Sequence, residues 1–199
     1  KITDRKEYKE VILSDDRILK TRNVLITTGA RHKKLGVIGE EQFLTAGISY
    51  CATCDGNFYK DKEVAVVGGG DTACEEATYL AKLCNKVYLI VRRDVLRASE
   101  AMQERVKNTE NIEILWNCNT QEILGDEYGV TGARLVRKDG EVFDIAVDGF
   151  FLAIGHHPNS ELFNQWVAVD KEGYIITDGK TSKTNVEGVF AAGDVQDPL

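Results

Sequence analysis

Residues 63–73 read Glu-Val-Ala-Val-Val-Gly-Gly-Gly-Asp-Thr-Ala, and the architecture of the chain follows from them. The first five form a short β-branched run that ends at turn residues, which predicts a buried strand over 63–67. After the glycines, apolar residues recur at helical spacing, at Ala73, Ala77 and Leu80. The stretch therefore predicts a strand, a tight glycine turn and a helix.

The turn itself, Gly68-Gly69-Gly70-Asp71-Thr72-Ala73, fits the pattern G-x-G-x-x-A. In this pattern the first glycine permits the tight turn and the second lets the backbone approach a pyrophosphate. The small Ala73 lets helix and strand pack closely, and the amides at the helix N-terminus face the phosphates. A plain tight turn is the alternative, but a strand before and a helix after favour a dinucleotide site over residues 68–72.

The segments on either side complete an α/β fold. Strands are predicted over 87–91 and 112–116 and a helix over 98–108, which gives the β-α-β-α-β order of a doubly wound, Rossmann-like parallel sheet. Three further runs, 121–124, 133–137 and 142–145, predict an antiparallel meander, and 150–154 predicts another buried strand. Nearer the ends, short strands are expected over 8–13, 18–20 and 24–28 and repeatedly within 166–194, with 31–47 as a connection.

The residues after the second strand of the doubly wound half indicate which dinucleotide binds. An NAD site usually places an acidic residue there for the ribose hydroxyls. This chain has Arg92 and Arg93, with Arg97 a turn later. Guanidinium groups suit a 2′-phosphate because they offer forked donors and stay charged. We expect NADPH rather than NADH, although Asp94 lies close enough in sequence to neutralise part of the cluster.

Upstream of the glycine turn, residues 51–56 read Cys-Ala-Thr-Cys-Asp-Gly. A Cys-x-x-Cys pair is half of a zinc site, a redox dithiol or a chance occurrence. A structural zinc needs four ligands, and neither the other cysteines nor His32, His156 and His157 complete a set, so no metal is expected. A redox pair fits better, since thiols at this spacing commonly have a depressed pKa. Asp55 then serves as proton donor or acceptor, or is simply an Asp-Gly turn residue.

Composition sets the remaining limits. Five cysteines form no even framework, which indicates a cytoplasmic protein in which Cys74, Cys84 and Cys118 are small buried side chains. The net charge of −7, with acids and bases interspersed, argues against a nucleic-acid surface. No apolar run reaches the roughly 18 residues of a membrane span, and the start lacks the shape of a signal peptide.

Taken together, the motifs make the chain resemble the low-molecular-weight, bacterial-type thioredoxin reductases. The resemblance rests on residues 51–56 and 68–77, on the arginines at 92, 93 and 97, and on Ala153-Ile154-Gly155-His156 with Pro158-Asn159. It extends to Gly188-Val189-Phe190-Ala191-Ala192-Gly193-Asp194, so the motifs occur in family order over nearly the whole chain. One departure is Val91, where the family often has a histidine.

A larger departure is that the chain carries one glycine fingerprint where the family has two. The resemblance implies that the N-terminal half of an FAD domain is absent. It implies an NADPH-binding domain with the redox pair over 35–156, flanked by partial FAD-domain segments over 1–34 and 157–199. This is the pyridine nucleotide-disulfide oxidoreductase fold.

The resemblance also implies residue roles. NADPH would lie against residues 68–72 with the three arginines, Ile154 and Gly155, and FAD of the complete protein against Thr28, Gly29, Asp194 and Val195. Electrons would pass from NADPH to FAD, to the Cys51–Cys54 disulfide and then to thioredoxin. Cys54 would face the flavin, Cys51 would attack thioredoxin, and Asp55 would manage the protons.

The implied activity is thus that of a thioredoxin-disulfide reductase using NADPH, in a protein that is a homodimer when complete, while this piece alone is expected to be inactive and monomeric. One alternative is the reductase module of a flavoprotein that reduces a peroxiredoxin. Such proteins usually carry other residues between the cysteines, so Ala52-Thr53 favours thioredoxin. A second alternative is an NADPH-binding fragment without turnover.

Overall fold

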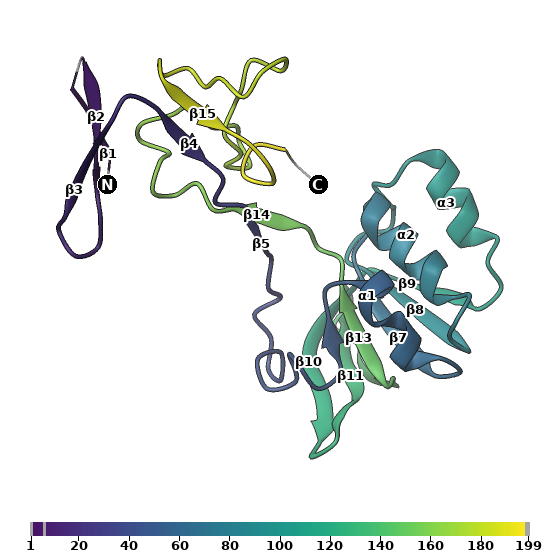
Figure 1. The fold of residues 1–199 in the computed structure, drawn as a ribbon. Coiled ribbons are helices and arrows are strands. Elements are labelled where there is room, and N and C mark those ends of the chain that lie inside the picture. The colour runs from purple at the N-terminus through teal and green to yellow at the C-terminus, as the bar shows by residue number, and fades with distance from the viewer. Residues whose placement is uncertain (1, 6, 198–199) are drawn as a thin grey trace. The chain divides into compact units, whose positions relative to one another are not determined.

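The computed structural model describes residues 2–5 and 7–197. The chain folds into two compact units (Figure 1). One consists of Lys34–Ile154, and the other combines Lys1–Lys33 with Gly155–Leu199. Cys51, Cys54 and the glycine turn all lie in the unit Lys34–Ile154.

A five-stranded parallel sheet is the centre of the unit Lys34–Ile154. Its strand order is β6 (Ile48–Ser49), β13 (Gly149–Leu152), β7 (Glu63–Val67), β8 (Lys86–Val91) and β9 (Ile112–Trp116). Helices α2 (Asp71–Leu80) and α3 (Glu100–Lys107) connect β7 to β8 and β8 to β9. The predicted doubly wound half is confirmed, with the strands at 63–67 and 112–116 at their predicted bounds.

The two faces of this sheet are covered differently, because side chains alternate along each strand. One face packs against the helices, and its buried members come from the sheet and from α2 and α3: Val64, Val66, Val87, Leu89, Phe151, Ala73, Ala77, Leu80 and Val106. The other face packs against the antiparallel strands, through Ala65, Val67, Ile90, Phe150, Leu152, Ile123, Ala133, Leu135 and Ile145. The parallel sheet is therefore buried on both sides, as parallel sheets normally are.

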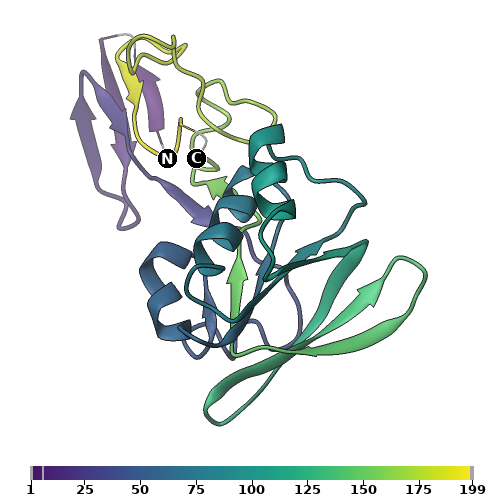
Figure 2. The ribbon, with the colours of Figure 1, turned by 90° about the vertical axis from the view of Figure 1, so that its right-hand side faces the viewer.

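The antiparallel layer is the predicted meander. Its strands β10 (Cys118–Asp126), β11 (Gly129–Arg137) and β12 (Val142–Ala146) pair in sequence order. Figure 2 shows it as the long teal and green strands beside the parallel sheet. Cys74, Cys84 and Cys118 are buried free thiols, as expected.

Three short elements around the cysteine pair had no counterpart in the sequence-based assignment. Strand β6 precedes the cysteine pair, helix α1 (Ala52–Asp55) contains its second cysteine, and the 3-10 helix η1 (Gly56–Tyr59) follows. A strand over Ala30–His32 overlaps the start of the stretch 31–47 that was expected as a connection. Short elements of this kind are set by tertiary contacts more than by local pattern.

The other unit is built from small sheets. Strands β1 (Ile2–Arg5), β2 (Tyr8–Ile12) and β3 (Ile18–Thr21) form an antiparallel sheet. Strand β4 (Val24–Ile26) pairs in parallel with β15 (Val189–Ala191), and β5 (Ala30–His32) pairs antiparallel with β14 (His156–Pro158). A small core holds β4, β15 and the tail together, with Ile26, Val167, Ile175, Val189, Ala191 and Val195 as its buried members.

The expectation of repeated short strands within 166–194 is wrong. In this stretch, which the structure describes throughout, only β15 is a strand, and two isolated bridges join Val169 to Ile175 and Lys183 to Phe190. Backbone amides here bond to side chains instead: Asp170 accepts from Tyr174 N, and Asp178 accepts from Thr181 N. Such bonds from backbone amides to Asp side chains give the backbone an alternative to a ladder.

Within the described residues, no helix is both long and apolar enough to cross a membrane.

Candidate active site

The two cysteines of the Cys-x-x-Cys motif are joined in a disulfide, with their Cα atoms 5.3 Å apart. Cys51 is the N-cap of α1, and its Sγ accepts a hydrogen bond of 3.2 Å from Cys54 N. Cys54 is exposed while Cys51 is half-buried. Since both sulfurs are bonded to each other, neither is a zinc ligand here. Among the described residues, no three His, Cys, Asp or Glu side chains gather as a metal site.

Asp55 is tied to the first cysteine through a buried serine. The Ser49 hydroxyl donates to Asp55 Oδ2 over 2.7 Å and accepts from Cys51 N over 3.0 Å. Asp55 is the last residue of α1 and Gly56 begins η1, so the dipeptide does not form the simple turn considered as the alternative. The structure thus holds a carboxylate one residue from Cys54 and fixes it by a hydrogen bond.

A second carboxyl group, that of Glu76, lies beside α1. It was not among the site residues predicted from the sequence. It lies on α2, and its Oε1 accepts a long hydrogen bond of 3.4 Å from Ala52 N. Burial raises the pKa of Glu76, and the nearby Glu75 carboxylate adds to this. The sequence did carry a signal: Glu76 stands three residues after Ala73 and four before Leu80, on the apolar face of the predicted helix.

The glycine turn connects β7 to α2 as predicted. Gly68 has a φ of +152°, and a Cβ added there would come within 2.7 Å of the Ala73 Cβ and closer still to the carbonyl oxygen of Ala153. Gly70 is the N-cap of α2, and no side chain caps this helix terminus. The close packing is thus the role of Gly68, and the first-turn amides of α2 stay available to an anion.

The segment that carries the arginines is fastened to this turn. Arg97 N donates to Gly69 O over 2.6 Å. Asp71 accepts from both Ser99 N and Ser99 Oγ, at 2.9 and 2.8 Å, and these bonds lower the pKa of Asp71. Asp71, expected to bind the cofactor, therefore joins the start of α2 to the N-cap of α3.

Arg92, Arg93 and Arg97 all follow β8 and all are exposed. Because β7 and β8 are parallel, their carboxyl ends lie at one edge of the sheet, which is also the edge of the glycine turn. Asp94 is exposed too, and no ion pair in the described chain joins it to these arginines. Three cations thus follow the strand next to an uncapped helix N-terminus.

The remaining predicted residues divide between the units. Ile154 ends the unit Lys34–Ile154, and Gly155, with a φ of +92°, begins the next segment of the other unit. In that unit the Thr28 hydroxyl donates to Asn159 O over 2.6 Å, and Gly29 has a φ of +69°.

The two expected flavin contacts near the C-terminus differ in exposure. Asp194 is exposed, whereas Val195 is fully buried in the small core.

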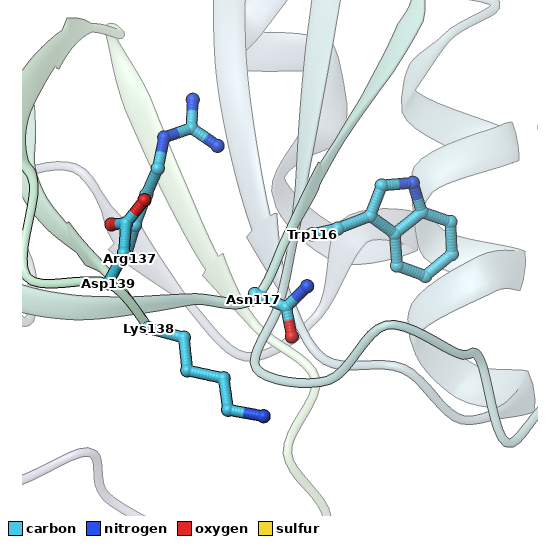
Figure 3. A pocket seen from close by; sticks show the side chains of 5 residues that line it. All are labelled: Trp116, Asn117, Arg137, Lys138 and Asp139. Carbon is cyan, nitrogen blue, oxygen red and sulfur yellow. The ribbon is translucent and has the colours of Figure 1, made fainter.

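An open pocket of about 440 Å³ lies at the end of β9, and one of its lining residues, Asn117, donates from its backbone N to Arg93 O over 3.2 Å. Its lining is Trp116, Asn117, Arg137, Lys138 and Asp139 (Figure 3). Arg137 already pairs with Glu141 and lies over the Phe143 ring. The pocket contains neither thiol of the pair and no residue of the glycine turn.

Comparison with known proteins places this geometry in a family. The sequence profile described as "Pyridine nucleotide-disulphide oxidoreductase" matches residues 1–198. Among curated relatives, thioredoxin reductase of Listeria monocytogenes is 45% identical over 196 residues, covering 98% of this chain and 61% of its own length. A Pseudomonas fluorescens protein named glucosaminate ammonia-lyase is 48% identical over 181 residues, covering 87% of this chain and 56% of its own.

A solved structure shows the same fold. The thioredoxin reductase of Lactococcus lactis, in what is called its FR conformation, matches with a TM-score of 0.84 at 40% identity, over 100% of this chain and 65% of its own. The chain spans about 60% of the length of the curated relatives that it matches. A parallel sheet with a glycine turn, a disulfide helix and a match over nearly every residue leave one conclusion: the chain belongs to the pyridine nucleotide-disulphide oxidoreductase family.

Proposed function

We propose that this chain is part of an NADPH-dependent thioredoxin reductase in which Cys51 and Cys54 are the redox-active pair. The observation that carries the proposal is the disulfide at the start of α1, with Asp55 held beside it, in the same compact unit as the glycine turn and the arginines. The relatives and structures named thioredoxin reductase support it. In these terms Lys34–Ile154 is the NADPH-binding domain and the other unit is part of an FAD domain.

The glycine turn fits a dinucleotide pyrophosphate. The uncapped start of α2 offers amides to a pyrophosphate, and a Cβ at Gly70 would meet nothing within 4 Å, so the turn is open there. Arg92, Arg93 and Arg97 would hold the 2′-phosphate. Thr28, Gly29, Asp194 and Val195 would contribute to FAD binding in the complete protein. When bound, NADPH supplies a hydride and FAD relays its electron pair.

The chain's own chemistry is thiol–disulfide exchange. Once Cys51 and Cys54 are reduced, the Cys51 thiolate attacks a thioredoxin sulfur, and the other thioredoxin sulfur leaves and takes a proton. Cys54 then attacks Cys51, which restores the Cys51–Cys54 bond and releases the second thioredoxin thiol. Asp55 receives the proton that Cys54 gives up and passes it to the departing thioredoxin sulfur.

A thioredoxin assay with the full-length protein tests this proposal. NADPH consumption in the presence of oxidised thioredoxin is expected, and Cys51→Ser should abolish it. Cys54→Ser should instead accumulate a covalent mixed disulfide with thioredoxin, visible on a non-reducing gel. Undiminished turnover in Cys51→Ser would rule out the pair as the route. The second candidate is a flavoprotein that reduces a peroxiredoxin, and replacing thioredoxin with an oxidised peroxiredoxin in the same assay tests it. The Ala52-Thr53 spacer disfavours this candidate.

Cofactor choice has its own test. Each arginine–phosphate contact contributes about 1.5–3 kcal/mol. Arg92→Ala with Arg93→Ala should therefore weaken NADPH binding at least about 100-fold and leave NADH binding nearly unchanged. Equal losses for both nucleotides would show that the arginines do not recognise the 2′-phosphate.

The name of the Pseudomonas relative suggests a different reaction, the elimination of ammonia from glucosaminate. That reaction has no need of a dithiol, so ammonia release that persists in Cys51→Ser would favour it. For the complete reductase we propose a homodimer in the cytoplasm, where the thioredoxin system keeps thiols reduced. Sedimentation of the full-length protein tests the dimer.

A further inference from the structure

Glu76 lies on α2, and its carboxyl group contacts the start of α1, the helix that contains Cys54. Its Oε1 accepts from Ala52 N at 3.4 Å, and Ala52 is the residue directly after Cys51. Its Oε2 is buried and has no hydrogen-bond partner. One oxygen is therefore weakly bonded and the other is not bonded at all, although an ionised carboxylate normally accepts several bonds.

This environment favours the neutral acid. Burial penalises the charged form and raises the pKa of Glu76. A buried carboxylate with one long hydrogen bond is poorly compensated, whereas a neutral carboxyl is much less costly there. The group therefore changes charge at a higher pH than an exposed glutamate does.

Few other charges act on Glu76. On its own helix, the Glu75 carboxylate opposes its ionisation. On α1 and its N-cap, the groups that ionise once the disulfide is reduced are Cys51, Cys54 and Asp55, and the Asp55 carboxylate is bonded to Ser49. The strands and the helix packed on α2 face it with buried or partly buried apolar residues: Val64, Val66, Val87, Leu89, Met102 and Val106. Among the groups on these elements, those that gain charge during thiol exchange are the Cys51 and Cys54 sulfurs.

We propose that Glu76 is a positioning residue that acts through the Ala52 peptide and sets how readily Cys51 becomes a thiolate. A carboxylate at Ala52 N opposes negative charge on the Cys51 sulfur, because like charges repel more strongly away from water. A neutral carboxyl does not oppose it. The inference rests on the proposed function of the cysteine pair and adds a residue to it.

Equilibration with glutathione tests this without added NADPH or thioredoxin. Two glutathione thiols become glutathione disulfide, the Cys51–Cys54 bond breaks, and the two electrons and two protons pass to the cysteine sulfurs. Above the thiol pKa one sulfur releases its proton to solvent. The fraction reduced is read by alkylation and mass spectrometry in the full-length protein from pH 4.5 to 8.5.

The informative variant is Glu76→Gln, which keeps the shape and an acceptor for Ala52 N but cannot ionise. At pH 8.5 its equilibrium constant should favour the dithiol about fivefold more than the wild type does, since one unit of thiol pKa is a factor of ten. At pH 4.5 the two proteins should coincide. Alkylation rates should show a lower pKa for the faster-reacting thiol. Glu75→Gln removes the exposed charge that opposes ionisation of Glu76, so its curve should coincide with the wild type at pH 8.5 and depart from the Glu76→Gln curve at a lower pH than the wild type does.

Two results would overturn the inference. One is a Glu76→Gln curve that follows the wild type at every pH. The other is a displacement that is equal at pH 4.5 and 8.5, which a purely structural role would give. If Glu76→Gln does not fold by circular dichroism, Glu76→Ala is measured against the same criteria. A pair that exchanges normally with glutathione but does not reduce thioredoxin would instead count against the proposed function alone.

Discussion

Replacing Gly68 with alanine tests the packing of the glycine turn directly. The new Cβ would stand 2.7 Å from the Ala73 Cβ and closer to the Ala153 carbonyl oxygen, where neither neighbour is the end of a flexible side chain. The φ of +152° at Gly68 is also one that alanine rarely adopts. Both strand and helix would have to move to admit the methyl group.

The expected loss combines two costs. Overpacking a well-packed site costs about 1–3 kcal/mol. Holding alanine in a backbone region suited to glycine costs about 1–3 kcal/mol more. The lower entropy of the unfolded alanine chain returns about 0.4–1 kcal/mol. The net expectation is a loss of about 3 kcal/mol, or roughly 1.5 M in the urea midpoint at a slope of about 2 kcal/mol per M.

The two tryptophans provide a probe for the correct unit. Trp116 lies in Lys34–Ile154 and Trp166 in the other unit. In a Trp166→Phe background, fluorescence during urea unfolding therefore reports on Lys34–Ile154 alone.

Neighbouring glycines serve as matched controls. Gly70→Ala meets nothing within 4 Å and should stay within about 1 kcal/mol of the parent, since its φ of −94° suits alanine. Gly69→Ala, with Val91 Cγ1 at 3.3 Å, should fall between the two. If Gly68→Ala and Gly70→Ala unfold at the same urea concentration, the packing argument is wrong.

Three further predictions concern buried or bonded groups. Asp71→Asn should remove a contribution to stability that depends on pH. Because bonds from Ser99 lower the pKa of Asp71, the ionised carboxylate stabilises the fold above about pH 4, and this stabilisation is lost as pH falls. The gap in thermal midpoint between wild type and Asp71→Asn should thus be wider at pH 7 than at pH 3, and an unchanged gap would contradict this. Glu40→Ala should lose about 2–4 kcal/mol in urea unfolding, because this buried carboxylate accepts two backbone amides over 3.0 and 2.6 Å, whereas Glu40→Gln should lose less. Burial raises the pKa of Cys74 and of Cys84 to about 11, so neither should react with a thiol reagent at pH 8 until the chain unfolds, and rapid labelling of either by mass spectrometry would refute this.

Local pattern was sufficient for the elements of the parallel sheet. The runs at 63–67 and 112–116 are short, apolar and bounded by turn residues, so their strands follow from residues close together in sequence. The meander was predictable for the same reason. Helix α1 was not predictable in this way, because four residues carry too little periodicity. Its conformation is stabilised by the disulfide, by the bond from Cys51 N to Ser49 and by the burial of Ala52.

The tail shows the opposite error. Residues 166–188 have strand-like composition, yet a strand needs a partner with free backbone groups. In this chain β15 pairs with β4, whereas backbone amides of the preceding residues donate to the nearby side chains of Asp170 and Asp178. Propensity alone does not reveal whether such a partner is present.

The chain's covalent order already contained the reactive groups: two cysteines three positions apart, three glycines after a strand, and arginines after the next. Their identity and spacing are local properties of the sequence, so these groups could be recognised without the tertiary structure. The pairing of groups distant in sequence was decided by how α1, α2 and α3 pack, which brings Glu76 to Ala52 across 24 residues and Asp71 to Ser99 across 28. A side chain's charge depends on burial and on such partners, and both exist only once the sheet and its helices have assembled.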